Sequence, residues 1–321
     1  MVVALKTSHV SFLLGVWILV FAALTPSQAA EWIEGAPIGQ ARAFGAAAAQ
    51  GDTVYVAGGA GLEKPAADFA AYDTIGDIWR PLPTMPIGRQ GFGMATAIDG
   101  GVYVSGGYAG EDFDLPSAEL WRYDMANAVW VRMSDMPAGR VRHGMASVDG
   151  KLYVVGGEGP NASRVFVYDT FQDQWADLGA DLPTLRKDLG VVAVNGSIYA
   201  LGGRTGSGVT AQVHRLDVAA KRWTRAAAIP APRADAAFGV VGAKIHVAGG
   251  RSNDPMRTFA EHYVLNTPTG SWQALDPLPF PRLGAASAGA GTLFVVIGGS
   301  GGAGVFSLFT TTDEVNIYES Q

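Results

Sequence analysis

Three residue patterns recur six times in phase along this chain, and they constrain its fold more than any other feature of the sequence. Double glycines begin at positions 58, 106, 156, 202, 249 and 298. Tryptophans stand at positions 32, 79, 130, 175, 223 and 272, and an arginine follows each of them by ten or eleven residues. A period of about 48 residues is typical of proteins built from one repeated supersecondary unit.

Each repeat predicts four short strands. In the second repeat these are residues 91–98, 102–105, 119–124 and 129–131. Tight hairpin turns are predicted at Asp99-Gly100, Asp149-Gly150, Asn195-Gly196 and Val241-Gly242, because glycine with Asn or Asp supplies the positive φ of such turns. Four-stranded sheets repeated at this period build a radial propeller. The sequence therefore predicts an all-β, six-bladed β-propeller with four antiparallel strands in each blade.

The phase of the repeats predicts how the ring closes. Trp32 precedes the first arginine, whereas the last repeat ends at Gln321 with no tryptophan after it. We therefore expect the N-terminal strand around Trp32 to complete the sixth blade.

The N-terminal segment has the pattern of a secretory signal peptide. Lys6 precedes an apolar run over residues 11–24, and small residues at Ser27 and Ala29 suit cleavage. The alternative is an uncleaved anchor, but 14 residues are short against the roughly 20 that span a bilayer. We expect residues 1–29 to be the signal peptide and residues 30–321 to form a single propeller domain. The expected location is secreted or periplasmic, with no membrane span after cleavage.

Composition narrows the function classes. The net charge is −6, which argues against nucleic acid as a partner. The chain has no cysteine, which excludes disulfides, thiolate metal sites and cysteine nucleophiles. His143, His214, His246 and His262 lack metal-ligand spacing, and the acidic residues 111–114 lack the spaced oxygen ligands of a calcium loop. No metal and no cofactor are expected.

The sixfold arginine is the polar series that has a position in every repeat. Because neighbouring strands are antiparallel, each arginine shares one face of the disc with the variable loop that follows each double glycine. This face supplies the candidate ligand-binding residues, which are Arg42, Arg89, Arg140, Arg186, Arg233, Arg282, Tyr108, Phe113, His143, Arg204 and Arg251. Two interpretations of the six arginines stay open. They bind backbone carbonyls and loop acids as structural residues, or they form a positive mouth for a ligand.

The spacing of arginine, double glycine, aromatic-acid pair and tryptophan resembles the kelch repeat. The aromatic-acid pairs are Tyr72-Asp73, Tyr123-Asp124 and Tyr168-Asp169, and later repeats depart to Leu216-Asp217, Leu265-Asn266 and Tyr318-Glu319. The resemblance implies a propeller. In the kelch propellers of ubiquitin-ligase adaptors, residues at the arginine position help to hold acidic peptides. The resemblance therefore implies such a role for the six arginines of this chain.

Two functions follow from this resemblance. The first is a non-enzymatic, monomeric binding module for a protein, an acidic peptide or an anionic glycan, acting through the face that carries the arginines and loops. The second is a mutarotase or epimerase of sialic acid type, similar to periplasmic kelch enzymes. Galactose oxidase chemistry is excluded, because it requires a cysteine cross-linked to a tyrosine and this chain has none.

Overall fold

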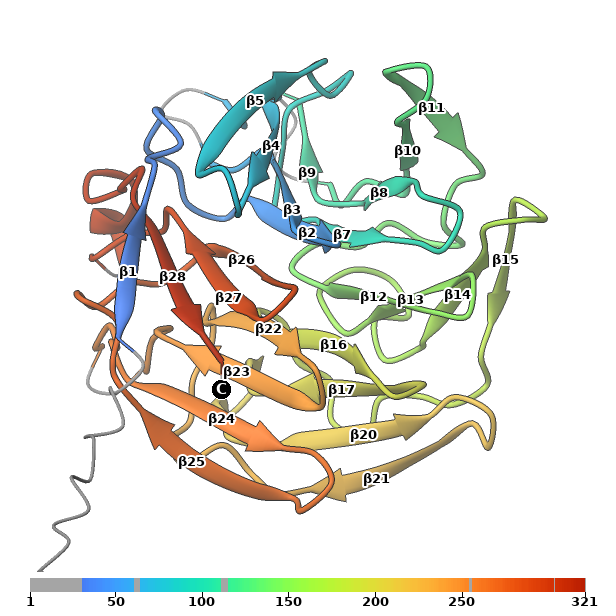
Figure 1. Ribbon diagram of the computed structural model, residues 1–321. Coiled ribbons are helices and arrows are strands. Elements are labelled where there is room, and N and C mark those ends of the chain that lie inside the picture. Colours follow the sequence, from blue (N-terminus) through green and yellow to red (C-terminus); the bar gives the residue numbers. More distant parts are fainter. Residues whose placement is uncertain (1–30, 61–63, 111–114, 254–255, 303, 321) are drawn as a thin grey trace, which may run out of the picture.

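Six antiparallel sheets stand around a central axis in the computed structural model (Figure 1), which describes residues 31–320 except 61–63, 111–114, 254–255 and 303. Each of these six sheets has four strands, and the innermost strands face the axis. The predicted all-β six-bladed propeller is confirmed.

The first three blades follow one another along the chain. Blade one contains β2 (Ala46–Gln50), β3 (Thr53–Ala57), β4 (Phe69–Asp73) and β5 (Ile78–Leu82). Blade two contains β7 (Gly93–Thr96), β8 (Val102–Ser105), β10 (Leu120–Asp124) and β11 (Val129–Met133). Blade three contains β12 (Gly144–Val148), β13 (Lys151–Val155), β14 (Phe166–Asp169) and β15 (Gln174–Asp177).

The other three blades complete the ring. Blade four contains β16 (Gly190–Val194), β17 (Ser197–Leu201), β20 (Val213–Asp217) and β21 (Arg222–Ala226). Blade five contains β22 (Ala237–Val241), β23 (Lys244–Ala248), β24 (His262–Asn266) and β25 (Ser271–Leu275). Blade six contains β26 (Ala286–Ala290), β27 (Leu293–Ile297), β28 (Val315–Glu319) and β1 (Trp32–Gly35).

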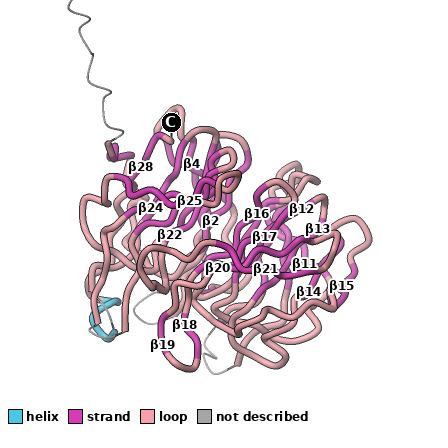
Figure 2. The backbone as a smooth tube through the Cα atoms, turned by 90° about the horizontal axis from the view of Figure 1, so that it is seen from below, coloured by secondary structure: helices cyan, strands magenta, loops and turns pink. Residues whose placement is uncertain are grey.

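Short elements decorate one face of the disc. Two-residue strands pair there as β6 (Arg89–Gln90) with β9 (Tyr108–Ala109), and as β18 (Arg204–Thr205) with β19 (Gly208–Val209). The loop between β27 and β28 contains a 3₁₀ helix, η1 (Gly304–Leu308). Figure 2 shows η1 and the β18–β19 hairpin on the same side of the disc. We call this side the loop face.

The second strand of each blade, such as β8 or β27, is apolar and almost fully buried, because other strands cover both of its faces, whereas outer strands such as β21 are largely exposed. The predicted tight turns at Asp149-Gly150 and Asn195-Gly196 have positive φ at both residues. The turn at Asp99-Gly100 is longer than predicted, since β7 ends at Thr96 and β8 begins at Val102. The Asp99 carboxylate there accepts a hydrogen bond from the Gly101 amide at 3.1 Å.

The N-terminal strand closes the ring, as its phase predicts. β1 pairs antiparallel with β28, from Trp32 opposite Tyr318 to Gly35 opposite Val315. The chain then passes to blade one, where the Ala36 amide donates to the Asp77 carboxylate at 2.6 Å. Both ends of the described chain therefore belong to one sheet, and β1 covers the edge of β28 that would otherwise be unpaired.

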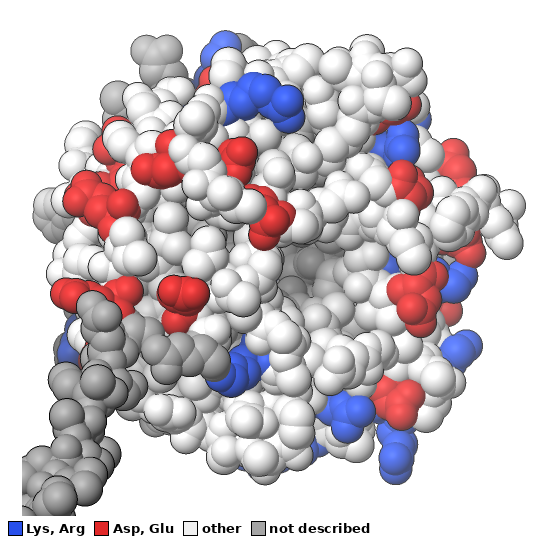
Figure 3. Space-filling model, in the orientation of Figure 1, with Lys and Arg blue, Asp and Glu red and all other residues white. Residues whose placement is uncertain are grey.

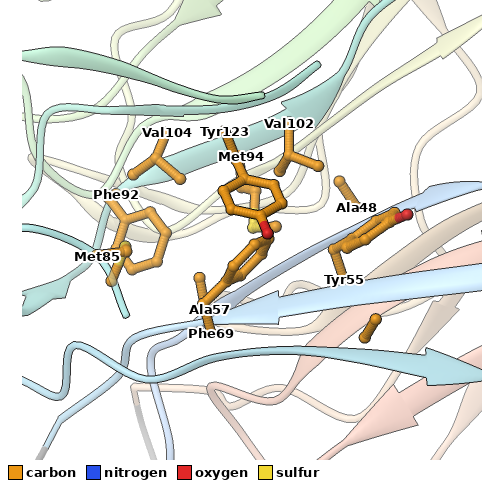
Figure 4. Packing of buried hydrophobic residues seen from close by; sticks show 11 residues of the cluster. Ala48, Tyr55, Ala57, Phe69, Met85, Phe92, Met94, Val102, Val104 and Tyr123 are labelled. Atoms are coloured by element: carbon orange, nitrogen blue, oxygen red, sulfur yellow. The ribbon is translucent and has the colours of Figure 1, made fainter. Parts of the chain in front are cut away.

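Apolar clusters fill the space between each pair of neighbouring blades. Figure 4 shows the cluster between blades one and two, in which Tyr55 and Phe69 meet Tyr123 and Met94. Corresponding clusters occupy the other five interfaces, including the one between blades six and one. Burial of these side chains, at about 25 cal/mol per Å² of apolar surface, is the main stabilising contribution.

The six tryptophans tie the outer strands together. In each case the indole Nε1 donates to a backbone carbonyl of the preceding blade at 2.7 to 3.1 Å. The pairs are Trp32 with Asp276, Trp79 with Ala36, Trp130 with Pro83, Trp175 with Ser134, Trp223 with Ala180 and Trp272 with Ala227. The recurrence of tryptophan therefore has a geometric cause, which is a bond between blades at every interface.

The signal peptide lies outside the described residues and stays a prediction, as does the division at residue 29. In the described part of the chain, no helix combines the length and hydrophobicity that a membrane crossing requires.

Candidate binding site at the mouth of the central channel

The six recurring arginines lie inside the protein. Their exposed fractions range from 0% at Arg140 and Arg233 to 6% at Arg42. Five guanidinium groups donate to the carbonyl of the first glycine of the same blade's pair, at 2.8 to 3.4 Å. Arg186 departs from this pattern and donates to the Ala200 carbonyl at 2.9 Å.

The backbone of the same arginines joins neighbouring blades. The amide of each second glycine donates to the arginine carbonyl of the next blade at 2.8 to 2.9 Å. The pairs are Gly59 with Arg89, Gly107 with Arg140, Gly157 with Arg186, Gly203 with Arg233, Gly250 with Arg282 and Gly299 with Arg42. Each arginine therefore fixes its own blade through its side chain and the preceding blade through its carbonyl.

Burial also acts on the charge of these groups. It lowers the pKa of Arg140, Arg186 and Arg282 to about 10, because a buried guanidinium loses the hydration that favours its charged form. In this arrangement the six side chains do not form a positive mouth, and they have the contacts of structural residues. Ligand binding by them stays a prediction that these contacts do not favour.

A second ring lies closer to the axis, two residues after each arginine. Its members are Phe44, Gly91, Arg142, Asp188, Asp235 and Gly284, and all have φ between 52° and 62°. The amide of each donates to the carbonyl of the preceding member at 2.6 to 3.2 Å, and the bond from Phe44 to Gly284 closes the circle. We call this the rim ring.

Positive φ costs free energy at residues other than glycine, and such positions often carry function. Four rim positions have a side chain despite this cost. The ring holds them at fixed places around the axis, because each backbone is bonded on both sides. Gly284 makes room for its neighbour, since a methyl group added there would lie 2.8 Å from the Phe44 ring.

The rim ring surrounds the entrance to a cavity of about 470 Å³ on the loop face. Below it, the channel continues as a space of about 370 Å³ that is lined by uncharged residues of the innermost strands. Figure 3 views the disc from the side away from the loops, where the centre is hollowed and charged side chains lie toward the outside. The charged side chains that line this passage therefore lie at its entrance, which we call the mouth.

Blades three to five contribute the charged half of the mouth. Arg251 Nε lies 2.6 Å from Asp235 Oδ2, and Arg204 Nε lies 3.1 Å from Asp188 Oδ2. Arg142 Nη1 lies 3.8 Å from the same Asp188 oxygen. The two carboxylate side chains are only 5% and 7% exposed. Three arginines facing two acids leave the lining with a net positive charge.

Asp188 is the most perturbed acid of the mouth. Burial raises its pKa, and repulsion from Asp235 raises it further, while the nearby arginines act in the opposite direction. The result is a pKa of about 6, so a carboxyl group that changes its charge near neutral pH lies beside three permanent cations.

Blades six, one and two contribute the apolar half. Phe44, Phe92, Tyr108 and Leu283 line this side, together with glycine and alanine. Ser307 of η1 also faces the cavity. The mouth is therefore polarised across its width, with charged groups on one side and aromatic surface on the other.

His143 lies where the mouth meets the channel. Its Nε2 is 2.9 Å from Ser105 Oγ, and its Nδ1 is buried without a hydrogen-bond partner. Burial lowers its pKa to about 3, so the ring is neutral at physiological pH. A neutral imidazole can donate or accept one hydrogen bond at the bottom of the mouth.

The structure brings together four of the predicted candidates, which are Tyr108, His143, Arg204 and Arg251. Phe113 falls outside the described residues, so its place stays open. Sequence reasoning missed Phe44, Asp188 and Asp235. A sequence pattern could have pointed to these three residues. Each stands two residues after a repeat arginine, at a position where two other repeats have glycine.

Metal ligands do not gather in the part of the chain that the structure describes. No three His, Asp or Glu side chains come together there in a way that could hold a metal ion. The acidic residues 111–114 lie outside this part.

Comparison with known proteins agrees with this architecture. The KLHDC2/KLHL20/DRC7 Kelch-repeats domain matches residues 95–299. Kelch-like protein terF of Aspergillus terreus is 28% identical over 247 residues, which cover 70% of this chain and 53% of that protein. Kelch-like protein 35 of Mus musculus is 28% identical over 267 residues, which cover 68% of this chain and 44% of that protein.

A bacterial enzyme is similar over a larger share of the chain. N-acetylneuraminate epimerase of Haemophilus influenzae is 28% identical over 269 residues, which cover 82% of this chain and 67% of the enzyme. This chain spans about half the length of the two Kelch-like relatives. The matched domain covers more than half of the chain and coincides with the observed blades, so this protein belongs to the kelch-repeat family.

Proposed function

We propose that this protein is an exported binding module whose mouth receives an acidic group of a protein segment. The observation that carries the proposal is the charged half of the mouth, where Arg142, Arg204 and Arg251 surround two carboxylates in a cavity of about 470 Å³. A cavity with a few convergent polar groups is the usual form of a ligand site.

The arginines retain capacity for a ligand. Arg204 and Arg251 meet Asp188 and Asp235 through Nε, and a guanidinium has five N–H donors in a planar fork. Such a fork matches a carboxylate in bidentate geometry. Asp188 and Asp235 hold the forks in place, so little side-chain entropy is lost when a ligand binds.

An anion-binding assay tests the proposal. Fluorescence anisotropy with a labelled peptide ending in two glutamates should show saturable binding to the wild type. Arg204→Gln should weaken it by about 30-fold or more, since truncating one partner of a charge pair that is largely shielded from solvent costs about 2 kcal/mol of affinity. Arg222→Gln, on the exposed outer strand β21, is the matched control and should leave the affinity unchanged.

Absence of acidic-peptide binding to the folded wild type would refute the proposal. Equal affinities for Arg204→Gln and Arg222→Gln would place the binding site elsewhere. Thermal midpoints of both variants show whether a loss of affinity comes from the mouth or from unfolding.

A second function is favoured by a specific observation, which is a carboxyl group with a pKa of about 6 in a cation-lined cavity. Such a group suits general acid–base catalysis of sugar ring opening, and the similar enzyme from Haemophilus influenzae is named an epimerase of N-acetylneuraminate. Anomer exchange of that sugar, followed by NMR, tests this alternative. Catalysis that is lost in Asp188→Asn would favour an enzyme over a binding module.

Export is part of the same proposal and rests on residues 1–29. We expect the protein to be secreted or periplasmic after cleavage. Intact-mass measurement of protein recovered outside the cytoplasm checks this, and a mature chain that still begins at Met1 would contradict it.

A further inference from the structure

Large apolar side chains are exposed on the loop face beside the mouth. Phe306 and Phe309 are 66% and 77% exposed, and both belong to the loop between β27 and β28. Met256, in the loop between β23 and β24, is 59% exposed. We call these three side chains the apolar shelf. Clustered exposed apolar groups on a folded chain mark an interaction site more often than scattered ones do.

The apolar shelf lies on loops next to the mouth. Gly304 and Ser307 of η1 line the cavity, and Phe306 lies between them in sequence. A methyl group added at Gly304 would lie 3.5 Å from Met256 Sδ, so the loops of blades five and six meet at this point. The Phe309 amide donates to the Phe306 carbonyl at 3.1 Å, which holds the two phenylalanines within one turn.

The neighbours of the apolar shelf determine which chemistry it faces. Blade five supplies both Met256 and the Arg251–Asp235 pair of the mouth. Blade six lies between this pair and Phe44, and it belongs to the apolar half of the mouth. A ligand whose acidic group is held by Arg251 would therefore leave the mouth over the apolar shelf.

We infer that the apolar shelf binds a bulky apolar side chain that lies next to the acidic group of the same protein segment. This inference rests on the proposed function and specifies which class of protein segment the mouth binds. Phenylalanine and methionine suit this role, because rigid aromatic and adaptable thioether surfaces are enriched at protein contacts. The charge of the mouth selects the acidic group, and the apolar shelf selects its neighbour.

Two fluorescein-labelled peptides test the inference with the full chain. Both end in two glutamates, and they differ only in having phenylalanine or serine immediately before them. The phenylalanine peptide should bind at least tenfold more tightly to the wild type. In the double variant Phe306→Ser, Phe309→Ser this preference should disappear, while the serine peptide keeps its affinity.

A matched control lies on the opposite face. Phe171 is 72% exposed in the turn between β14 and β15, so Phe171→Ser removes similar surface far from the mouth and should change neither affinity. Met256→Gln provides an independent single change, which should reduce the preference in part. If the double variant melts early, this single variant decides the result.

The outcomes separate the two proposals. If neither peptide binds the folded wild type, both the proposed function and this inference fail. If both peptides bind equally, or if the preference survives in the double variant, the inference is overturned while the proposed function stands. If sedimentation shows a dimer that the double variant converts to monomer without changing peptide affinity, a second copy covers the apolar shelf and the inference is overturned.

Discussion

Replacing Arg140 by alanine tests whether the recurring arginines are structural. Arg140 is fully buried, and its guanidinium donates to Gly156 O at 2.9 Å and to Asn161 O at 3.1 Å. It also lies 4.6 Å from the centre of the Phe166 ring. The variant therefore loses these two hydrogen bonds, two longer ones of 3.4 Å to Ala162 O and Arg164 O, a cation–π contact and the packing of the side-chain methylenes.

These losses set the expected magnitude. Hydrogen bonds to a charged group contribute about 1.5–3 kcal/mol each, and two buried methylenes contribute about 0.8 kcal/mol each. Relief of the buried charge offsets part of this, because burial has already lowered the pKa of Arg140 to about 10. We expect a net destabilisation of about 3–5 kcal/mol, or a lower thermal midpoint by roughly 10 °C for a domain of this size.

Thermal and guanidinium melts followed by tryptophan fluorescence measure the effect. Arg164→Ala is the control, since Arg164 is 52% exposed and forms a surface ion pair with Asp177. Its midpoint should stay close to that of the wild type. If Arg140→Ala melts like Arg164→Ala but loses peptide binding, Arg140 is a ligand-binding residue and the structural interpretation is refuted.

Three further predictions concern the channel wall, the interface between blades five and six, and the mouth. Gly289→Ala should destabilise the protein by several kcal/mol in denaturant melts, because its new methyl group would lie 1.8 Å from Val240 O. Burial lowers the pKa of His246 to about 4 and of His262 to about 3, so their contribution to stability is complete above pH 6.5 and is lost as the pH falls toward 3–4. The urea midpoint should therefore fall as the pH is lowered from 7.5 to 4.5, and it should fall less steeply in the double variant His246→Asn, His262→Asn. Parallel pH profiles of wild type and variant would contradict this. Peptide affinity should rise as the pH falls from 7.5 to 5, because protonation of Asp188 adds net positive charge to the mouth; Asp188→Asn should abolish that dependence.

The sequence by itself determined the architecture of this protein. The phase of glycine, tryptophan and arginine predicted six blades, and the unpaired Trp32 predicted the closing strand that pairs with β28. This succeeded because a four-stranded blade cannot bury both of its faces alone, so the pattern must repeat until the ring closes. The position of the variable loops on one face followed from antiparallel pairing alone, and four candidates from that face do line the mouth.

Only the tertiary structure decided what the charged residues do. An arginine at the start of a strand can point outward or inward, and the carbonyls of the double glycines draw these arginines inward. The mouth instead depends on Asp188, Asp235 and Arg142, whose positive φ is imposed by hydrogen bonds between blades. Local sequence does not encode these bonds, because each joins residues more than 40 positions apart, and they form only when neighbouring blades pack together.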